Sequence, residues 1–283
     1  KYADEIEKSA YNDLLGAQAP TGDNWCYYSF PNGRRVFTTY WRCCKSSGPW
    51  ALEELSPVAY ALTASGGIAV NLYGPGQASL TTSQAGVVRL AQVTRYPFDG
   101  LIRITVHPER AAKFAISVRI PGWAEQATVQ VNDGATSAGT PGTYTALERV
   151  WQTGDVITLS LPMPLKLHRQ VNRNVQESRA PDGSPVAQEV LRFDYAAITR
   201  GPLVYATGLI DGFKIEETIR LPADLASALK VLDAPDGPDA PVVQLELGYR
   251  PALEFRPYYE AGGRADGTWR LTWLQLAPDQ TAT

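Results

Sequence analysis

The chain has 283 residues, of which 44% are hydrophobic and 19% are charged, and this length predicts about two domains. Its 24 glycines and 21 prolines favour short strands joined by tight turns over a bundle of helices. The net charge of −3 argues against nucleic acid as a partner, and no apolar run approaches the roughly 20 residues of a membrane span, so we expect a soluble protein without a membrane partner.

The N-terminal segment has the pattern of an amphipathic helix over residues 2–15, and Gly16 is a natural stop. One stripe of this helix is apolar and consists of Tyr2, Ile6, Ala10 and Leu14. The pattern starts directly after Lys1, without an initiator Met, a helix cap or a signal peptide. We therefore interpret the chain as part of a longer protein, whose compartment the sequence leaves open: the cytoplasm or periplasm of a bacterium.

A second helix is predicted from Ser46 to Leu62, with Pro49 near its first turn. Pro57 must kink or restart this helix, and the Gly66-Gly67 pair ends the helical region. Two helices cannot form a core by themselves. They need further helices, or another surface, on which to pack.

From Ile68 onward the hydrophobic period changes to two, which predicts strands. The clearest strand is Phe114–Ile120, with Ser117 and Arg119 on the face opposite its apolar side chains. Asn132-Asp133-Gly134 predicts a hairpin turn in which Asp-Gly supplies the positive φ. Further strands with the same pattern are Ile68–Leu72, Ile102–Val106, Thr128–Val131 and Val156–Leu161.

A second β-rich region begins near Lys166. Its predicted strands are Val190–Ile198, Leu203–Tyr205, Val242–Leu247 and Trp269–Leu276, and its predicted loops are Arg179–Pro185 and Ala234–Pro241. The fold class is therefore mainly β, with two antiparallel β-sandwich domains after a short helical segment. We place the domain boundaries at residues 1–67, 68–165 and 166–283.

Cys43 and Cys44 are adjacent, and a disulfide between them would be strained because bridged Cα atoms prefer about 4.4–6.8 Å while a trans peptide holds neighbours about 3.8 Å apart. This favours two thiolates, which a zinc ion would hold together and whose pKa values Arg42 and Lys45 would lower. Two alternatives remain: a pair of buried, inert thiols, or a vicinal-dithiol redox site.

Other polar residues give weaker signals. His107 and His168 are isolated, and Glu53 and Glu54 have the spacing of a solvated helix face. An aromatic stretch suits either the faces of a sugar or a loop wedged against the core; it consists of Trp25, Tyr27, Tyr28, Phe30, Tyr40 and Trp41.

Several blocks of the sequence, taken in order, resemble glycoside hydrolase family 127, the β-L-arabinofuranosidase family. They span most of residues 1–210, and the ordered set with its vicinal cysteines is more specific than any single block. The blocks are Tyr2–Asn12, Arg42–Cys44, Ile68–Tyr73, Val118–Trp123, Val131-Asn132, Trp151–Asp155, Leu161–Met163 and Arg200–Tyr205.

The resemblance implies that residues 1–67 are the remnant of a six-hairpin α/α barrel, followed by two β-sandwiches. It implies that Cys43 is a nucleophile held as a thiolate on zinc, that Cys44 is a zinc ligand, and that Tyr28 lines the sugar site. The family's other zinc ligands, in a Glu-x-Cys motif, and its acid/base glutamate would lie upstream of Lys1. Cys26 does not match the upstream cysteine.

By this resemblance the chain is the C-terminal part of a retaining glycoside hydrolase that acts on β-L-arabinofuranosides or related pentosides, with zinc as cofactor and a carbohydrate as partner. Because the upstream residues are missing, we expect the chain alone to be inactive. The alternative is a non-catalytic carbohydrate-binding or structural β-sandwich module, in which both cysteines would be dispensable. The sequence leaves the oligomeric state open, a homodimer included.

Overall fold

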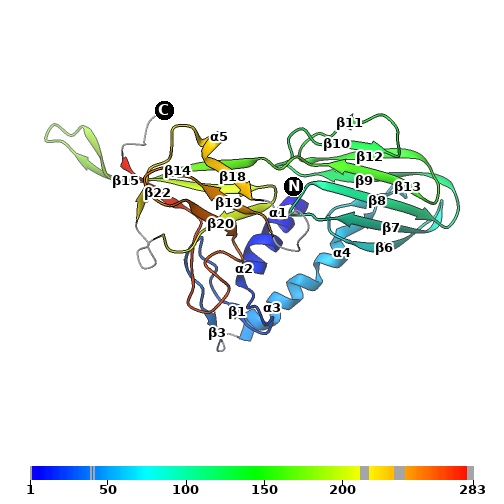
Figure 1. Ribbon diagram of the computed structural model, residues 1–283, viewed down its shortest axis with the longest axis horizontal. Helices are drawn as coiled ribbons and strands as arrows, with labels where there is room; N and C mark the ends of the chain where they lie inside the picture. The colour runs from blue at the N-terminus through cyan, green and yellow to red at the C-terminus, as the bar shows by residue number, and fades with distance from the viewer. Residues whose placement is uncertain (1, 39, 41, 211–216, 233–239, 279–283) are drawn as a thin grey trace. The chain divides into compact units, whose positions relative to one another are not determined.

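The computed structural model describes residues 2–38, 40, 42–210, 217–232 and 240–278, and the chain forms two compact units (Figure 1). The first unit comprises residues 1–18, 39–164 and 200–203, and the second comprises residues 19–38, 165–199 and 204–283. Most of the regular structure is β-strand, which confirms the predicted fold class. Within the described residues, no helix has both the length and the apolar character needed to cross a membrane.

The N-terminal helix forms as predicted and extends to Ala17. It has three consecutive parts: α1 (Tyr2–Lys8), the π-helical turn η1 (Ser9–Leu14) and α2 (Leu15–Ala17). Its most buried side chains are Glu7 and Asn12, whereas Tyr2 is 82% exposed. The most buried contacts of this helix therefore come from hydrogen-bonded polar side chains and not from the apolar stripe.

The second helix differs from its prediction at both ends. Helix α3 (Arg42–Glu53) begins four residues before Ser46 and continues through Pro49, and α4 (Leu55–Ala59) contains Pro57 in its third position. The prediction of helix through Leu62 is wrong, because Tyr60–Leu62 is strand β4, paired antiparallel with β5 (Ile68–Val70). The ladder hydrogen bonds to β5 satisfy backbone groups that a further helical turn would otherwise pair.

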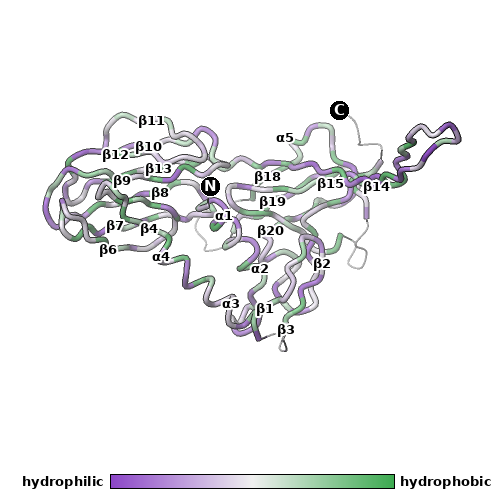
Figure 2. The backbone as a smooth tube through the Cα atoms, turned by 180° about the vertical axis from the view of Figure 1, so that it is seen from behind, coloured by the Kyte–Doolittle hydropathy of each residue, from purple (hydrophilic) through white to green (hydrophobic). Residues whose placement is uncertain are grey.

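The first unit contains a two-layer β-sandwich. One sheet has six strands in the order β11-β10-β13-β8-β7-β6, and the other has four in the order β12-β9-β5-β4. The remaining strands of the two sheets are β6 (Gly76–Thr82), β7 (Gly86–Thr94), β8 (Leu101–Pro108), β9 (Ala112–Ile120), β10 (Thr128–Val131), β11 (Ser137–Ala138), β12 (Thr143–Trp151) and β13 (Asp155–Ser160). The strands predicted from period-two spacing are confirmed as β5, β8, β9, β10 and β13, along which hydrophobic and hydrophilic residues alternate (Figure 2). Strands β6, β7, β11 and β12 were not predicted.

The core of the sandwich lies between the two sheets. Fully buried side chains from both layers fill it, including Ile102 and Ile104 of β8 and Ile116 and Val118 of β9. Burying one such side chain contributes about 1.5–3 kcal/mol relative to leaving it exposed, so this core is the main source of stability in the unit.

The hairpin between β10 and β11 is confirmed, with Thr128 opposite Ala138. The expected source of its positive φ is wrong. Asn132 has φ 51°, while Gly134 is not left-handed. Asn tolerates this conformation better than most residues because its short polar side chain forms local hydrogen bonds. Here Asn132 Nδ2 donates to Asp155 Oδ1 at 2.8 Å.

The second unit is built on an eight-stranded sheet, with the path β17-β22-β15-β16-β20-β19-β18 and β14 paired to β15. Its strands are β14 (Leu165–Arg179), β15 (Pro185–Arg200), β16 (Leu203–Ala206), β17 (Thr218–Ile219), β18 (Leu229–Leu232), β19 (Val242–Leu245), β20 (Leu253–Pro257) and β22 (Leu274–Leu276). The short helix α5 (Leu225–Ala228) precedes β18 and is capped by Asp224.

All four strands predicted for this region form, although Trp269–Leu276 is divided into β21 (Trp269–Leu271) and β22. The predicted loop 179–185 is the turn between β14 and β15, and residues 234–239 of the other predicted loop lie outside the described residues.

Residues 19–38 belong to the second compact unit. Strand β2 (Asn32–Arg34) pairs with β21, and β1 (Trp25–Cys26) pairs with β3 (Phe37–Thr38). Asn32 reinforces the first of these pairings, since its side chain donates to the Trp273 carbonyl at 2.6 Å and accepts from two backbone N–H groups. The compact units therefore do not follow the order of the sequence, whereas the predicted boundaries do.

Candidate functional site

The two adjacent cysteines lie in the first turn of α3, in the first unit. Cys43 is exposed and Cys44 is half-buried, and their Sγ atoms are 3.8 Å apart. The hydroxyl groups of Ser46 and Ser47 donate to the Cys43 carbonyl at 3.0 and 2.7 Å. The pair is therefore accessible and is held on regular helical backbone.

The expectation that neighbouring basic residues lower the thiol pKa values is wrong for Cys44. Partial burial and the hydrogen bond with Cys43 raise the pKa of the Cys44 thiol, and the interaction with Cys43 acts in the same direction. Two adjacent thiols disfavour a second negative charge unless a cation lies between them. The predicted alternative of two buried, inert thiols is also wrong, because Cys43 is exposed.

The spacing of the two sulfur atoms suits a tetrahedral metal ion. Two thiolates, each about 2.3 Å from such an ion, lie about 3.8 Å apart, and the Sγ atoms of Cys43 and Cys44 have this separation. Among the described residues, however, no group of three or more His, Cys, Asp or Glu side chains is placed to hold a metal. The pair fits two corners of a zinc site, and the described part of the chain adds no third.

Tyr28 and its aromatic neighbours belong to the second unit. Tyr28 is 62% exposed, stacks on Phe30 with 5.4 Å between ring centroids, and meets Tyr27 edge-on at 4.6 Å. These three rings form an exposed aromatic patch, whereas Trp25 is buried in the core as the simpler interpretation predicted. Tyr40 is exposed in the first unit, and Trp41 lies outside the described residues.

The remaining sequence candidates have ordinary surroundings. Glu53 and Glu54 are exposed on α3 and directly after it, and Glu54 accepts a hydrogen bond from Trp50 Nε1 at 2.8 Å. His168 is exposed and bonds to Thr199, and His107 lies half-buried on β8. Cys26 is buried, and this burial raises the pKa of its thiol.

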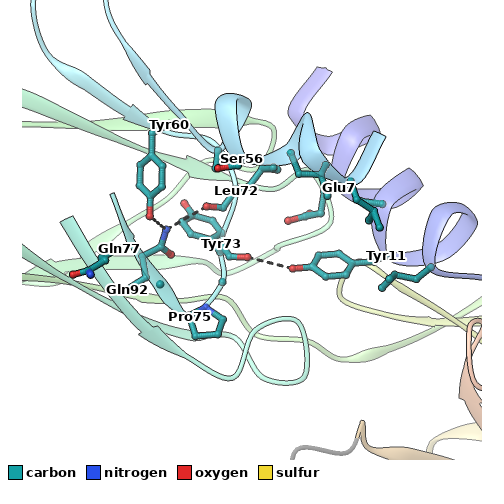
Figure 3. Close-up of a pocket in the computed structure, with 16 residues that line it drawn as sticks. Glu7, Tyr11, Ser56, Tyr60, Leu72, Tyr73, Pro75, Gln77 and Gln92 are labelled. Atoms are coloured by element: carbon teal, nitrogen blue, oxygen red, sulfur yellow. Dashed lines mark hydrogen bonds between the residues drawn. The ribbon is translucent and has the colours of Figure 1, made fainter. Parts of the chain in front are cut away.

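Sequence reasoning missed two features of the first unit. The first is a buried ionic cluster, in which Arg119 on the outer face of β9 pairs with Asp4 and Glu7 of α1 and is only 2% exposed. The second is a cavity of about 440 Å³ that Glu7 also lines (Figure 3). The spacing Asp4-x-x-Glu7, one helical turn, was the available signal for the cluster. No sequence pattern indicated the cavity, because its walls come from segments that are separate in the sequence.

Comparison with known proteins supports the family resemblance. Residues 67–163 match the family model described as the middle domain of glycoside hydrolase family 127 β-L-arabinofuranosidases. This segment includes strands β5 to β13, the greater part of the sandwich in the first unit. No curated protein matches the chain in sequence.

Three solved structures share the fold. One, a glycoside hydrolase, is 26% identical with a TM-score of 0.73, and the alignment covers 98% of this chain and 48% of that one. A GH127 β-L-arabinofuranosidase from Geobacillus stearothermophilus T6 is 24% identical with a TM-score of 0.70, over 98% and 46% of the two chains. A GH127 β-arabinofuranosidase is 21% identical with a TM-score of 0.73, over 99% and 46%.

The chain thus spans about half the length of the structures that it matches. The similarity to the last two structures is below 25% identity and supports the fold alone, whereas the family model matches the sequence itself. The resemblance inferred from the ordered sequence blocks is confirmed: residues 67–163 match the middle domain of glycoside hydrolase family 127, the β-L-arabinofuranosidase family.

Proposed function

We propose that this chain contributes the nucleophile of a retaining glycoside hydrolase that acts on β-L-arabinofuranosides or related pentosides. Cys43 is the proposed nucleophile, and Cys44 is its partner in a zinc site. The observation that supports this most is the accessible thiol pair, 3.8 Å apart in the first turn of α3, in a chain that carries a GH127 middle domain.

Zinc is the proposed cofactor because its preferred ligands include thiolates and because the sulfur spacing suits tetrahedral coordination. When bound, the ion would keep both sulfur atoms deprotonated. Since the described residues add no third ligand, we propose that the others are the glutamate and cysteine of the family's Glu-x-Cys motif, which this chain does not contain.

In the proposed reaction, the Cys43 thiolate attacks the anomeric carbon of the bound sugar. A C–S bond forms while the glycosidic C–O bond breaks, and a carboxylic acid gives its proton to the leaving oxygen. Water then attacks the same carbon, loses a proton to that carboxylate and releases the sugar from sulfur. Two inversions at one carbon retain its configuration.

The position of Cys43 on α3 favours this role. The N-terminal turn of a helix stabilises negative charge through the helix dipole, and Cys43 lies in this turn of α3. The general acid would be a glutamate outside this chain by family resemblance. We therefore propose that the isolated chain does not hydrolyse glycosides.

Tyr28 is the proposed sugar-contacting residue. Aromatic faces stack against the C–H faces of sugars, and Tyr28 presents an exposed ring braced by Phe30 and Tyr27. The same exposed aromatic patch is the observation that favours the second candidate function, a carbohydrate-binding module without catalysis.

The test uses the complete protein that carries this sequence, with p-nitrophenyl β-L-arabinofuranoside as substrate. Cys43→Ala should reduce kcat/KM by more than about a thousandfold, because it removes the bond-forming atom. Cys44→Ala should release zinc, measured by elemental analysis, while the matched control Cys26→Ala should keep both zinc and activity. Unchanged zinc content and turnover in Cys43→Ala would contradict the proposed nucleophile and favour the carbohydrate-binding module.

A further inference from the structure

A cavity of about 440 Å³ in the first unit is lined by neither Cys43 nor Cys44; Figure 3 shows the residues that line it. Its lining includes Leu52 of α3, which follows Cys44 by eight residues, or about 12 Å along the helix axis. The other walls come from the N-terminal helix (α1, η1 and α2), α4, β4, the segment that follows β5, and strands β6 and β7. A molecule in this cavity therefore packs against the C-terminal end of α3, whereas the proposed nucleophile lies at its N-terminal end.

We propose that this cavity binds a small neutral ligand with an apolar ring and one hydroxyl group, that is, an aromatic or alicyclic alcohol. This site is independent of the proposed glycosidase activity. Its size and its lining of aromatic and aliphatic side chains, with few polar groups, are typical of small-molecule sites.

The walls of the cavity determine the apolar part of the ligand. Tyr11 and Tyr73 contribute rings, and the Tyr11 hydroxyl is held by donating to the Tyr73 carbonyl at 3.2 Å. Aliphatic side chains complete these walls: Leu15, Leu52, Leu55 and Leu72. Such a surface favours a flat or ring-shaped hydrocarbon group.

Gln92 determines the polar part of the ligand. It is 5% exposed, and its Nε2 donates to the Tyr60 hydroxyl at 2.5 Å and to the Leu72 carbonyl at 3.3 Å. Because a carbonyl can only accept, the amide orientation is fixed. Its Oε1 is buried and receives no hydrogen bond from any residue that the structure describes. An unpaired buried acceptor is unfavourable, so a ligand that donates to Gln92 Oε1 would be stabilised there.

Tyr60 adds the complementary donor. Its hydroxyl oxygen accepts the bond from Gln92, which leaves the hydroxyl proton to be donated to a ligand oxygen. Burial raises the pKa of Tyr60, so this proton is retained at neutral pH. In our proposal, Gln92 Oε1 and the Tyr60 hydroxyl are the acceptor and the donor that hold the hydroxyl group of the ligand.

The charge balance of the cavity favours a neutral ligand. Glu7 lines it, but this carboxylate is paired with Arg119 and accepts from the Tyr96 hydroxyl at 2.6 Å. Two further polar side chains that line the cavity, Ser56 and Gln77, are exposed to solvent. A free pentose would place several hydroxyl groups against apolar walls, which disfavours sugar as the occupant.

Isothermal titration of this chain with 2-naphthol tests the proposal, with 2-methylnaphthalene as the isostere that cannot donate. We expect one saturable site that prefers 2-naphthol by about threefold to tenfold, as one buried hydrogen bond provides. Gln92→Leu should abolish this preference. The matched control Gln152→Leu, an exposed glutamine in the turn between β12 and β13, should keep it.

A second variant locates the binding. Ser56→Phe places a ring at the exposed rim, where folding tolerates it, and should weaken both naphthalenes alike by narrowing the entrance. Equal affinity for the two naphthalenes in the unmodified chain, binding that Gln92→Leu and Ser56→Phe leave unchanged, or a tighter fit for L-arabinose than for 2-naphthol would each overturn the proposal.

Discussion

The β-sandwich and helix α3 of the first unit differ in how far their side chains are buried. Along strands β8 and β9, every second side chain is hydrophobic and buried in the core, such as Ile104 and Ile116, which are 0% exposed. Helix α3 has twelve residues, of which Gly48 alone is buried, and it leaves Trp50 65% exposed and Cys43 open to solvent.

From this difference we expect the sandwich to determine the stability of the unit and the first turn of α3 to determine its reactivity. Substitutions in the sandwich, or in the ionic cluster that fixes α1 to it, should lower the free energy of unfolding. Substitutions at the head of α3 should leave folding nearly unchanged and act on reactivity. Substitutions in the two regions should therefore differ in their effect on the free energy of unfolding.

The largest expected effect is that of Glu7→Gln. This change removes the buried carboxylate opposite Arg119, whose side chain is only 3% exposed, and should lower the free energy of unfolding by about 3–5 kcal/mol. Denaturant unfolding measures it. The matched control is Glu5→Gln on the same helix, whose ion pair with Lys8 is more than half exposed and should contribute less than about 1 kcal/mol. Equal losses in the two variants would contradict a structural role for the cluster.

Ile104→Ala should lower the free energy of unfolding by about 2–5 kcal/mol, because it leaves a void in a filled core. Trp50→Ala removes a larger side chain from α3 but should lower it by less than about 1 kcal/mol, since the ring is mainly solvated and makes one exposed hydrogen bond. The comparison between sandwich and helix fails if Trp50→Ala proves as harmful as Ile104→Ala.

Asp155→Asn should have a smaller, pH-dependent effect. Partial burial opposes ionisation, but hydrogen bonds from Asn132 and the Gln152 N–H outweigh it and hold the pKa of Asp155 below its usual value. A lowered folded-state pKa stabilises the protein above the unfolded-state pKa, and this contribution disappears as pH falls through the folded-state value.

The unfolding free energies of wild type and Asp155→Asn should therefore differ by about 1 kcal/mol at pH 7, as expected for the loss of one or two such bonds. The difference should shrink below about pH 4, near the unfolded-state pKa of aspartate. Denaturant unfolding at several pH values measures this. A difference that grows as pH falls would contradict the assigned direction of the shift.

The smallest stability effect should be that of Cys43→Ala, within about 0.5 kcal/mol of wild type because the side chain is exposed. In the unmodified chain, iodoacetamide should label Cys43 at least about tenfold faster than the buried Cys26, which reacts only when the structure opens. Peptide mass spectrometry distinguishes the two thiols. Comparable labelling rates would show that α3 does not expose Cys43.

The sandwich strands could be predicted because period-two alternation is a local property of each segment. Features that depend on distant partners could not. In the sequence, Arg119 has the spacing of a solvent-facing residue of a strand, but in the structure it pairs with Glu7 of α1. Residues Tyr60–Leu62 continue a helical pattern in the sequence, but in the structure they form a strand paired with β5. The vicinal cysteines were identified from adjacency alone. Their exposure and the early start of α3 became apparent only from the backbone, and the unpaired oxygen of Gln92 only from the packing of segments that are distant in the sequence.

The most direct test of the proposed nucleophile is to trap the intermediate. The complete protein that carries this sequence would be incubated with 2,4-dinitrophenyl β-L-arabinofuranoside, quenched in acid during turnover, digested and mapped by mass spectrometry. Our account predicts one pentosyl group on Cys43 and none on Cys44 or Cys26. A pentosyl group on a carboxylate, or steady turnover with no adduct on Cys43, would contradict it.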